Sequence, residues 1–323
     1  MTVPPAMAPQ FEVGTGFGYA KLILVGDHWV LDGAAALAVA LPQWRTVVSV
    51  RPAAVGSGVL VDTPDADLST DQRLQTLAMA RLACQQAQVG DAQVSVTSTV
   101  PIRRRLGSSA AFAVALVRAL ADGKGEDLSD TTLVTRARAL EALVHGQSSG
   151  LDPAAASVGP GAVLFQNGMV VRRITSIGPG LAAARWVLAD IGQGVPTAHA
   201  VRHALAQRTN LAAQDRNLWL ARVTSAAQAA GRALEQGNLD HLALALNAAA
   251  ASLVPLDIAS ESMQLALQAM QRAGAAAVKP TGAGMGGCLL ALAPNVTTAL
   301  AVAEACGGLS KSIHVLAVRP AEL

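Results

Sequence analysis

The chain has 323 residues, a formal net charge of +2 and only 3% aromatic residues. Its length is typical of two packed domains of about 100–200 residues each. The scattered charges and few aromatic residues indicate neither a basic surface nor a stacking platform for nucleic acid. The three cysteines lie far apart without a CxxC pair, which argues against a disulfide framework or a zinc site and favours a reducing cytoplasm.

The hydrophobic content of 52% requires that a membrane protein be considered. The two longest charge-free stretches, residues 153–171 and 280–303, each contain two prolines and several glycines, which would leave backbone groups unpaired in lipid. The first eleven residues carry neither lysine nor arginine and no continuous apolar segment, so they do not resemble a secretory signal. We therefore expect no membrane span and no membrane partner.

In chain order, the first third favours strands and the next segment favours helices. Short β-branched or alternating segments predict strands at residues 21–26, 46–50, 58–61 and 93–100, with one helix between 71 and 88. After residue 100, apolar residues recur about every four positions, which predicts two helices that end at Gly123 and Gly146.

The second half begins with a hairpin and becomes mainly helical. Strands at 162–166 and 169–173 are expected to join through Asn167-Gly168. Helices are predicted from 197 to 273, with breaks near Arg208, Gly237 and Pro255. The chain then predicts strands at 275–279, 288–293 and 313–318 and a helix at 296–305. A boundary near 175–185 divides this α+β chain into an N-terminal domain, 1–180, and a C-terminal domain, 181–323.

The segment PIRRRLGSSAA, residues 101–111, lies between a predicted strand and a helix. Gly107 permits close backbone approach, and Ser108 and Ser109 are suited to cap the helix. Free amides and the positive end of the helix dipole suit a phosphate group, and a serine hydroxyl there can ligate magnesium. Considered alone, the segment is more typical of an ordinary helix cap.

The segment EALVHGQSSGLDP, residues 141–153, offers two carboxylates. Phosphoryl transfer requires one carboxylate for the metal and one near the attacking hydroxyl, and Glu141 and Asp152 can fill these roles. The alternative is a surface pair of Glu141 and His145, with Asp152 as a helix cap before Pro153.

The segment KPTGAGMGGC, residues 279–288, contains a G-x-G-x-x-G pattern but runs into a second apolar strand rather than a helix. The dinucleotide-binding interpretation therefore fails on context. A glycine loop between two strands can still enclose a ligand. No Walker A pattern occurs in the chain.

Together these segments resemble the family of galactokinase, homoserine, mevalonate and phosphomevalonate kinases. AKLILVGDHWVLDGAAALAVAL, PIRRRLGSSAAF and KPTGAGMGGCLLAL are similar to its three motifs, and EALVHGQSSGLDPA and GVPTAHAV are closest to its mevalonate kinases. The resemblance implies an N-terminal ribosomal S5 domain 2-like domain with a mixed sheet, a C-terminal α+β domain, and bound ATP and Mg²⁺. It implies phosphorylation of mevalonate to 5-phosphomevalonate in isoprenoid biosynthesis, in the cytoplasm. A homodimer is one alternative for the oligomeric state.

The resemblance also implies roles for individual residues. Asp152 matches the catalytic base, Lys21 the lysine close to it, and Ser109 and Glu141 the magnesium ligands. The phosphate-binding loop corresponds to Arg103, Arg104, Arg105, Leu106, Gly107, Ser108 and Ser109. The substrate side corresponds to His28, Thr197, Gly282 and Ala283.

Three positions depart from the family pattern. Arg105 replaces a glycine of the phosphate loop, where it either strains the backbone or contacts phosphates. Asp27 replaces the usual glutamate before the histidine, and Pro153 replaces the usual asparagine after the base.

Other functions stay open at this point. A sister kinase that acts on phosphomevalonate or another small alcohol is favoured by the arginine run 103–105. A ligand sensor that lacks turnover is disfavoured by retention of Asp152, Ser109, Glu141 and Lys21. A decarboxylase of the same fold is disfavoured because the first motif lacks that branch's Lys-Tyr-Trp-Gly stretch.

Overall fold

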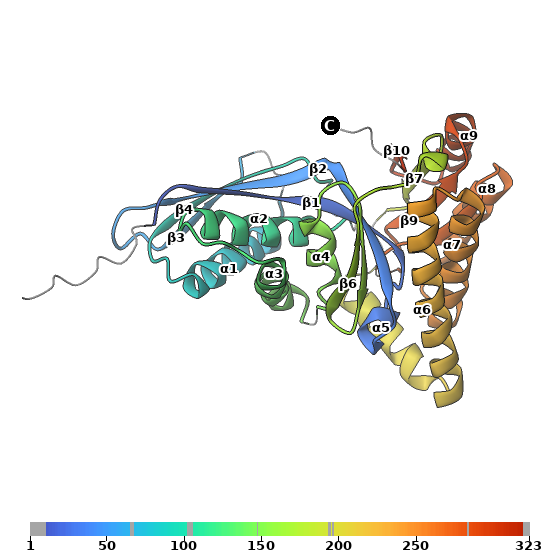
Figure 1. Cartoon of the computed structure of the whole chain (residues 1–323), viewed down its shortest axis with the longest axis horizontal. Coiled ribbons are helices and arrows are strands. Elements are labelled where there is room, and N and C mark those ends of the chain that lie inside the picture. The colour runs from blue at the N-terminus through green and yellow to red at the C-terminus, as the bar shows by residue number, and fades with distance from the viewer. Residues whose placement is uncertain are drawn as a thin grey trace, which may run out of the picture. The chain divides into compact units, whose positions relative to one another are not determined.

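The structure is a computed structural model that describes residues 11–64, 68–101, 106–146, 148–192, 195, 197–282 and 284–318. The chain divides into two compact units whose segments alternate along the sequence (Figure 1). The described part of the first unit comprises residues 11–20, 42–64, 68–100, 107–146 and 148–157. That of the second unit comprises residues 21–41, 101, 106, 158–192, 195, 197–282 and 284–318. The boundary expected near residues 175–185 stays a prediction.

Strands of the first unit pair around β4 (Ala92–Ser98). β4 is antiparallel to β2 (Ala36–Pro52), from Thr46 opposite Ser98 to Pro52 opposite Ala92, and parallel to β3 (Val59–Asp62). The alternating burial of β4 places Val94 and Val96 in the core of this unit, as expected for a sheet that is covered on one face.

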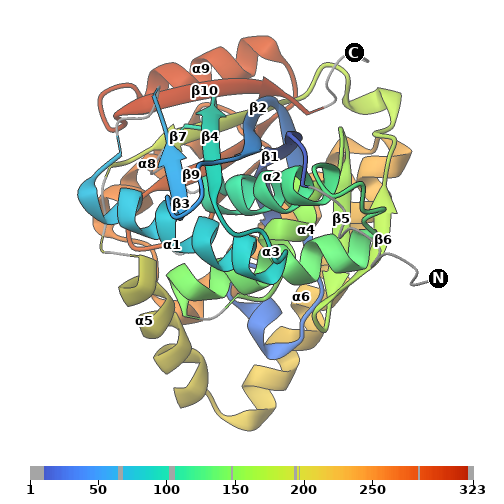
Figure 2. The ribbon, with the colours of Figure 1, turned by 90° about the vertical axis from the view of Figure 1, so that its left-hand side faces the viewer.

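Four helices complete the first unit. They are α1 (Thr70–Gln86), α2 (Ser108–Asp122), α3 (Asp130–His145) and α4 (Leu151–Ser157). Ser69 and Gln72 form a capping box at the start of α1, and the Ser129 side chain caps α3. α1, α2 and α3 lie alongside one another (Figure 2), and α2 is the central helix, with eleven of its 15 residues buried.

Three alternate glycines bring β1 (Gly14–Val25) against α2. A Cβ atom added to Gly14, Gly16 or Gly18 would lie 2.0, 2.2 or 2.2 Å from the carbonyl oxygens of Ala119, Ala115 and Ala111, respectively. Every second residue of a strand advances by about 6.6 Å, and every fourth residue of a helix by about 6 Å. Successive glycines of β1 can therefore each meet a successive turn of α2. The strand therefore begins seven residues before the predicted start at Lys21, because glycine is a weak strand signal.

The second unit contains the predicted hairpin of β5 (Ala162–Gln166) and β6 (Met169–Ile174). Asn167 and Gly168 both have positive φ angles, 51° and 80°, as a two-residue type I′ turn requires. β5 pairs antiparallel with the beginning of β2, from Ala36 to Val39.

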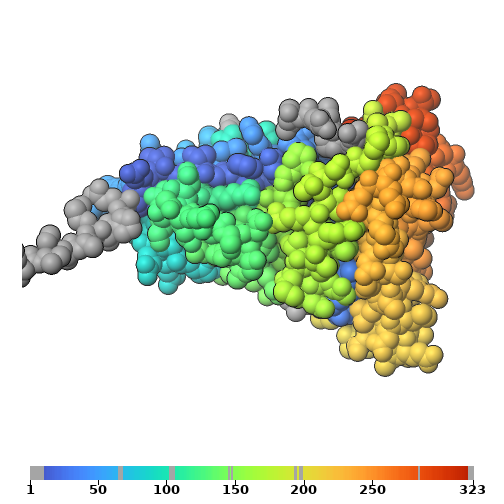
Figure 3. Space-filling view, viewed as in Figure 1, coloured from blue at the N-terminus to red at the C-terminus, as the bar shows by residue number. Residues whose placement is uncertain are grey.

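A second sheet of this unit has the order β10-β7-β9-β8, and its neighbouring strands are antiparallel. Its strands are β7 (Arg185–Asp190), β8 (Ala277–Pro280), β9 (Cys288–Ala293) and β10 (Ser312–Ala317). The helices are α5 (Thr197–Asn210), α6 (Ala213–Gln236), α7 (Leu239–Leu253), α8 (Glu261–Arg272) and α9 (Val296–Cys306). Helices α8 and α9 pack on the sheet, and Figure 3 shows α6 on the outer face of this unit.

Among the described helices, one segment, Leu239–Leu256, is long and apolar enough to cross a membrane by length and composition alone. Most of it is α7, which packs against α6 and β8. Leu242, Leu246 and Leu253 are buried within these contacts, as in the core helix of a folded domain.

Candidate active site

The start of α2 forms the described part of the expected phosphate loop. Gly107 occupies the cap position in the left-handed conformation, with φ 77°, and no side chain caps the helix. The prediction that Ser108 and Ser109 cap α2 is wrong, because both residues are already helical. The first turn of a helix of this length presents unsatisfied amides and a partial positive charge, which suit an anion. Residues 103–105 lie outside the described residues.

Ser109 and Glu141 are brought together by the packing of α2 against α3. The Ser109 hydroxyl donates a hydrogen bond of 2.7 Å to Glu141 Oε1, and Glu141 is only 3% exposed. Hydroxyl and carboxylate oxygens are ligands that Mg²⁺ prefers, and Mg²⁺ on a nucleotide needs only one or two protein carboxylates. The pair therefore fits a magnesium ion, although the described residues contain no cluster of three or more acidic, histidine or cysteine ligands. The side chain of His145 lies outside the described part.

Asp152 is the second residue of α4 rather than its cap, because the helix already begins at Leu151. Two serine side chains shape the preceding turn: Ser148 accepts from the Gly150 amide at 3.3 Å and Ser149 from the Leu151 amide at 3.2 Å. The half-buried carboxylate lies in the first turn, where the helix dipole favours a negative charge. Since α4 packs against α2 and α3, the first unit holds Asp152, Ser109 and Glu141 on three helices in mutual contact.

Lys21 lies within β1 and is only 3% exposed. Its backbone amide donates to the carbonyl of Leu106 at 2.9 Å, which joins the strand to the residue just before Gly107. Lys21 and Leu106 both belong to the second unit.

His28 lies on a tight turn that follows β1 and precedes the short 3₁₀ helix η1 (Trp29–Asp32). Its backbone has φ 63° and ψ −45°, and the residue is 8% exposed. A non-glycine residue in such a sparsely populated region costs about 1–3 kcal/mol, so the surroundings must hold it there.

The glycine loop between β8 and β9 has the predicted strand–loop–strand context. Four described glycines, Gly282, Gly284, Gly286 and Gly287, have positive φ angles between 72° and 113°. Gly287 exchanges two backbone hydrogen bonds of 2.9 Å with residues 191 and 192. Ala283 lies outside the described residues.

Sequence analysis missed a buried ion pair that joins this loop to the His28 turn. Lys279 Nζ lies 2.6 Å from Asp27 Oδ2, and both side chains are 1% exposed. The other oxygen of Asp27 accepts from the Gly282 amide at 2.9 Å. Asp27 and Lys279 are 252 positions apart, so no local pattern could have identified them as a pair.

Arg208 on α5 was also missed as a functional candidate and considered only as a helix break. Its guanidinium donates to the carbonyl of His28, lies 3.2 Å from Asp32 Oδ2, and is 2% exposed. Burial lowers the pKa of Arg208, and the neighbouring Asp32 partly opposes this effect. Thr197 begins the same helix, and its side chain lies outside the described part.

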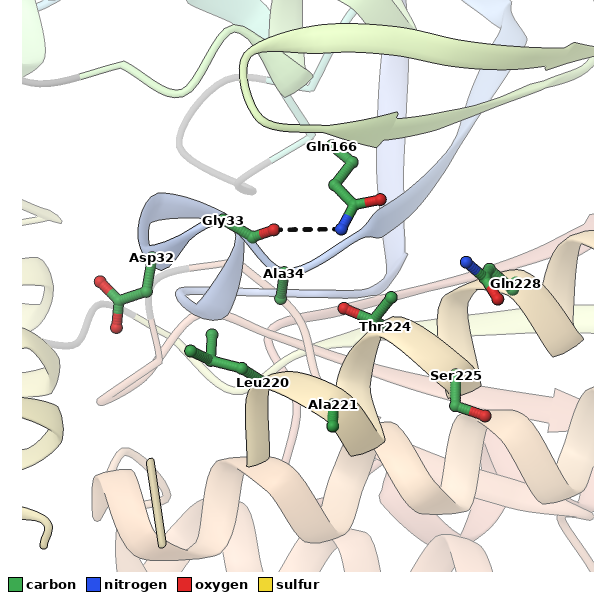
Figure 4. Close-up of a pocket in the computed structure, with 9 residues that line it drawn as sticks. All are labelled: Asp32, Gly33, Ala34, Gln166, Leu220, Ala221, Thr224, Ser225 and Gln228. Atoms are coloured by element: carbon green, nitrogen blue, oxygen red, sulfur yellow. Dashed lines mark hydrogen bonds between the residues drawn. The ribbon is translucent and has the colours of Figure 1, made fainter. Parts of the chain in front are cut away.

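A pocket of about 450 Å³ lies within the second unit, between the η1 turn, β5 and α6 (Figure 4). Two of its polar side chains already bind backbone: Gln166 donates to the Gly33 carbonyl at 3.3 Å, and Thr224 accepts from the Ala35 amide at 3.1 Å. None of the sequence-predicted site residues is among the residues that line it. The pocket therefore does not coincide with the predicted site.

Comparisons with known proteins identify the family of this chain. The models "GHMP kinases N terminal domain" and "GHMP kinases C terminal" match residues 75–160 and 232–308. Mevalonate kinase from Aeropyrum pernix is 30% identical over 286 residues, 84% of this chain and 86% of that protein. Mevalonate kinase from Pyrococcus furiosus is 28% identical over 320 residues, 88% and 91% of the two chains.

A solved structure supports the same conclusion at the level of the fold. The structure of L. major mevalonate kinase in complex with R-mevalonate has a TM-score of 0.79 and 24% identity, and the match covers 100% of both chains. The α+β two-domain kinase fold expected from the sequence is thereby confirmed. The chain belongs to the GHMP kinase family and, within it, to the mevalonate kinases.

Proposed function

We propose that this ATP-dependent kinase transfers the γ-phosphoryl group of ATP to the primary hydroxyl group of mevalonate, which gives ADP and 5-phosphomevalonate. The similarity to mevalonate kinases over more than four fifths of the chain carries this proposal. The hydrogen-bonded pair of Ser109 and Glu141 at the start of α2 supports it, because phosphoryl transfer needs such oxygen ligands beside a phosphate-binding helix end.

Asp152 is assigned as the general base. Its carboxylate orients the hydroxyl of mevalonate and accepts the proton as the oxygen–phosphorus bond forms and the bond to ADP breaks. The packing of α4 against α2 and α3 supports this role, because it holds Asp152 in the same unit as Ser109 and Glu141. Lys21 is assigned to stabilise negative charge on the transferring group.

The amides of the first turn of α2, with residues 103–109, are assigned to bind the phosphates of ATP. Ser109 and Glu141 would hold Mg²⁺. When bound, the ion neutralises negative charge that develops on the phosphate oxygens. Both protein ligands are fixed before the nucleotide arrives, because their hydrogen bond joins two packed helices.

The substrate side is assigned to His28, Thr197, Gly282 and Ala283. Mevalonate carries a carboxylate at one end and the reactive hydroxyl at the other, so a donor is needed for the first group while Asp152 reaches the second. His28 is the donor that we assign, because its turn is held rigidly by buried contacts. We place the enzyme in the cytoplasm as a homodimer, which sedimentation of the purified protein would check.

An assay of ADP release over mevalonate, phosphomevalonate, homoserine and galactose tests the proposal. We expect turnover with mevalonate that exceeds turnover with each of the other three alcohols. Turnover of phosphomevalonate with none of mevalonate would assign the chain to the sister kinase and make the arginine run its second phosphate site. Binding of ATP without ADP release from any alcohol would favour the sensor.

A further inference from the structure

The His28 turn is held from two sides by cations that the reaction as proposed does not use. Lys279, from β8, reaches the turn through Asp27. Arg208, from α5, reaches it through the carbonyl of His28 itself and through Asp32. All of these residues belong to the second unit, so the arrangement is complete within one compact part of the chain.

The Lys279 side of this arrangement is almost fully enclosed. Lys279 Nζ contacts Asp27 Oδ2 at 2.6 Å and donates to the carbonyl of Ile23 at 3.3 Å. Thr281, at the beginning of the glycine loop, donates to the same carbonyl at 3.3 Å. A buried ion pair often adds little net stability over an apolar pair of the same shape, whereas removal of one partner alone is costly. The contribution of this pair to the geometry of the turn is therefore the property to test.

The shorter side chain at position 27 is explained by these contacts. Asp27 places one carboxylate oxygen on Lys279 and the other on the Gly282 amide, 2.9 Å away, directly from the turn. The carboxylate thereby connects the glycine loop to the residue next to His28.

The Arg208 side holds the backbone of His28 directly. The planar guanidinium can contact a carbonyl and a carboxylate together, which the single ammonium of a lysine does less well. Asp32 is 25% exposed, so it can be solvated if the guanidinium is removed. Loss of Arg208 would therefore release the turn without leaving a fully buried carboxylate.

We propose that Lys279 and Arg208 are positioning residues, which hold His28 in its positive-φ conformation and so aim its imidazole at the carboxylate end of mevalonate. The proposal rests on the proposed function of His28. Without these contacts, the turn relaxes toward negative φ and the imidazole points elsewhere. The cations act on substrate affinity through His28 and do not touch the substrate.

A double-mutant cycle between positions 208 and 28 tests this mechanism. Arg208→Met should raise the KM for mevalonate about tenfold and leave the KM for ATP nearly unchanged, because only the substrate end is displaced. In a His28→Ala background, Arg208→Met should have no further effect, since the group that it positions is gone. Effects that multiply across the cycle would overturn the proposal.

Two further variants keep the test decisive. Arg208→Lys retains the charge and should raise the KM for mevalonate less than Arg208→Met does. If Arg208→Met does not fold, Arg208→Lys takes its place in the double-mutant cycle. Asp27→Asn with Lys279→Met removes the buried charges together and should also raise the KM for mevalonate selectively. The proposal would be contradicted if the KM for mevalonate were unchanged both in this double variant and in whichever Arg208 variant folds.

Arg136→Met is the matched control. Arg136 forms two hydrogen bonds of 2.7 and 2.9 Å with Glu126 in the first unit, and Glu126 is exposed to an extent similar to Asp32. This variant loses a guanidinium ion pair that makes no contact with the residues of the His28 turn, so both KM values should stay the same.

Hydrogen–deuterium exchange separates this proposal from the proposed function. Amides of residues 26–33 should exchange faster in the Arg208 and Lys279 variants than in the wild type or in Arg136→Met. The wild type could fail to phosphorylate mevalonate while residues 26–33 still exchange faster in the variants. In that case the proposed function is wrong, but Lys279 and Arg208 do stabilise the His28 turn. Unchanged exchange of residues 26–33 in the variants would show that Lys279 and Arg208 do not stabilise the His28 turn, whichever substrate the enzyme uses.

Discussion

Ser109 and Glu141, 32 residues apart in the sequence, are joined by a hydrogen bond of 2.7 Å that connects the start of α2 to α3. The bond occupies one oxygen of a carboxylate that is almost fully buried. A buried carboxylate needs polar partners, and the Ser109 hydroxyl is one of them. Hydroxyl and carboxylate oxygens are the ligands that Mg²⁺ prefers, so this pair is the one that we propose as the magnesium site.

Glu141→Gln should raise the magnesium concentration required for half-maximal activity about tenfold, because an amide oxygen is a weaker ligand than a carboxylate. The KM for mevalonate should change much less. Titration of magnesium at saturating ATP measures the effect, and Glu126→Gln, in the same unit, is the control. Unchanged magnesium dependence in Glu141→Gln would remove this residue from the metal site.

Asp152→Asn should lower kcat by at least about 10²-fold while the KM for ATP stays nearly the same, because the amide cannot accept the hydroxyl proton. Steady-state kinetics measures both values. Asp130→Asn is the matched control, since Asp130 is likewise acidic in the first turn of a helix but has no assigned catalytic role. Near-normal turnover in Asp152→Asn would end the assignment of the base.

Gly16→Ala should destabilise the first unit by about 1–3 kcal/mol or more, because the new methyl group would overlap the carbonyl oxygen of Ala115 in α2. Since α2 carries Ser109, activity should also be lost at a lower temperature. Thermal unfolding measures the change. Gly90→Ala is the control, because an added Cβ at Gly90 meets nothing within 4 Å. Equal melting temperatures for the two variants would contradict close packing of β1 on α2.

Local signals in the sequence were sufficient for most elements of the fold. The strand at 288–293 and the hairpin through Asn167 and Gly168 agree with the structure, because turn chemistry and apolar runs act over a few residues. The start of β1 was missed, since glycines 14, 16 and 18 are explained only by a helix about 100 residues later.

Only those residues of the candidate site that lie in local sequence motifs could be predicted. The carboxylates and serines stay predicted site residues, and their prediction was possible because each lies in a recognisable sequence motif. The structure brings two of them, Ser109 and Glu141, together. Lys279 opens the glycine-rich segment and Arg208 lies in no motif, but neither position indicated burial. Their partners lie 252 and 180 positions away, and a single lysine or arginine is usually exposed. Only the folded chain shows that both cations are buried beside the same turn.

His28→Ala should raise the KM for mevalonate several-fold and barely change the KM for ATP, because the imidazole is the proposed donor to the substrate carboxylate. His28→Gly should have the same kinetic effect, since it also lacks the imidazole. His241→Ala, an exposed histidine on α7, is the control and should leave both KM values unchanged.

His28→Ala and His28→Gly should differ in stability because of the backbone conformation at position 28. At φ 63° and ψ −45°, alanine retains the backbone strain and glycine relieves it. We therefore expect the glycine variant to be more stable than the alanine variant by about 1 kcal/mol in denaturant unfolding. Equal stability would mean that the turn relaxes once the imidazole is lost. An unchanged KM for mevalonate in both variants would show that another group meets the substrate carboxylate.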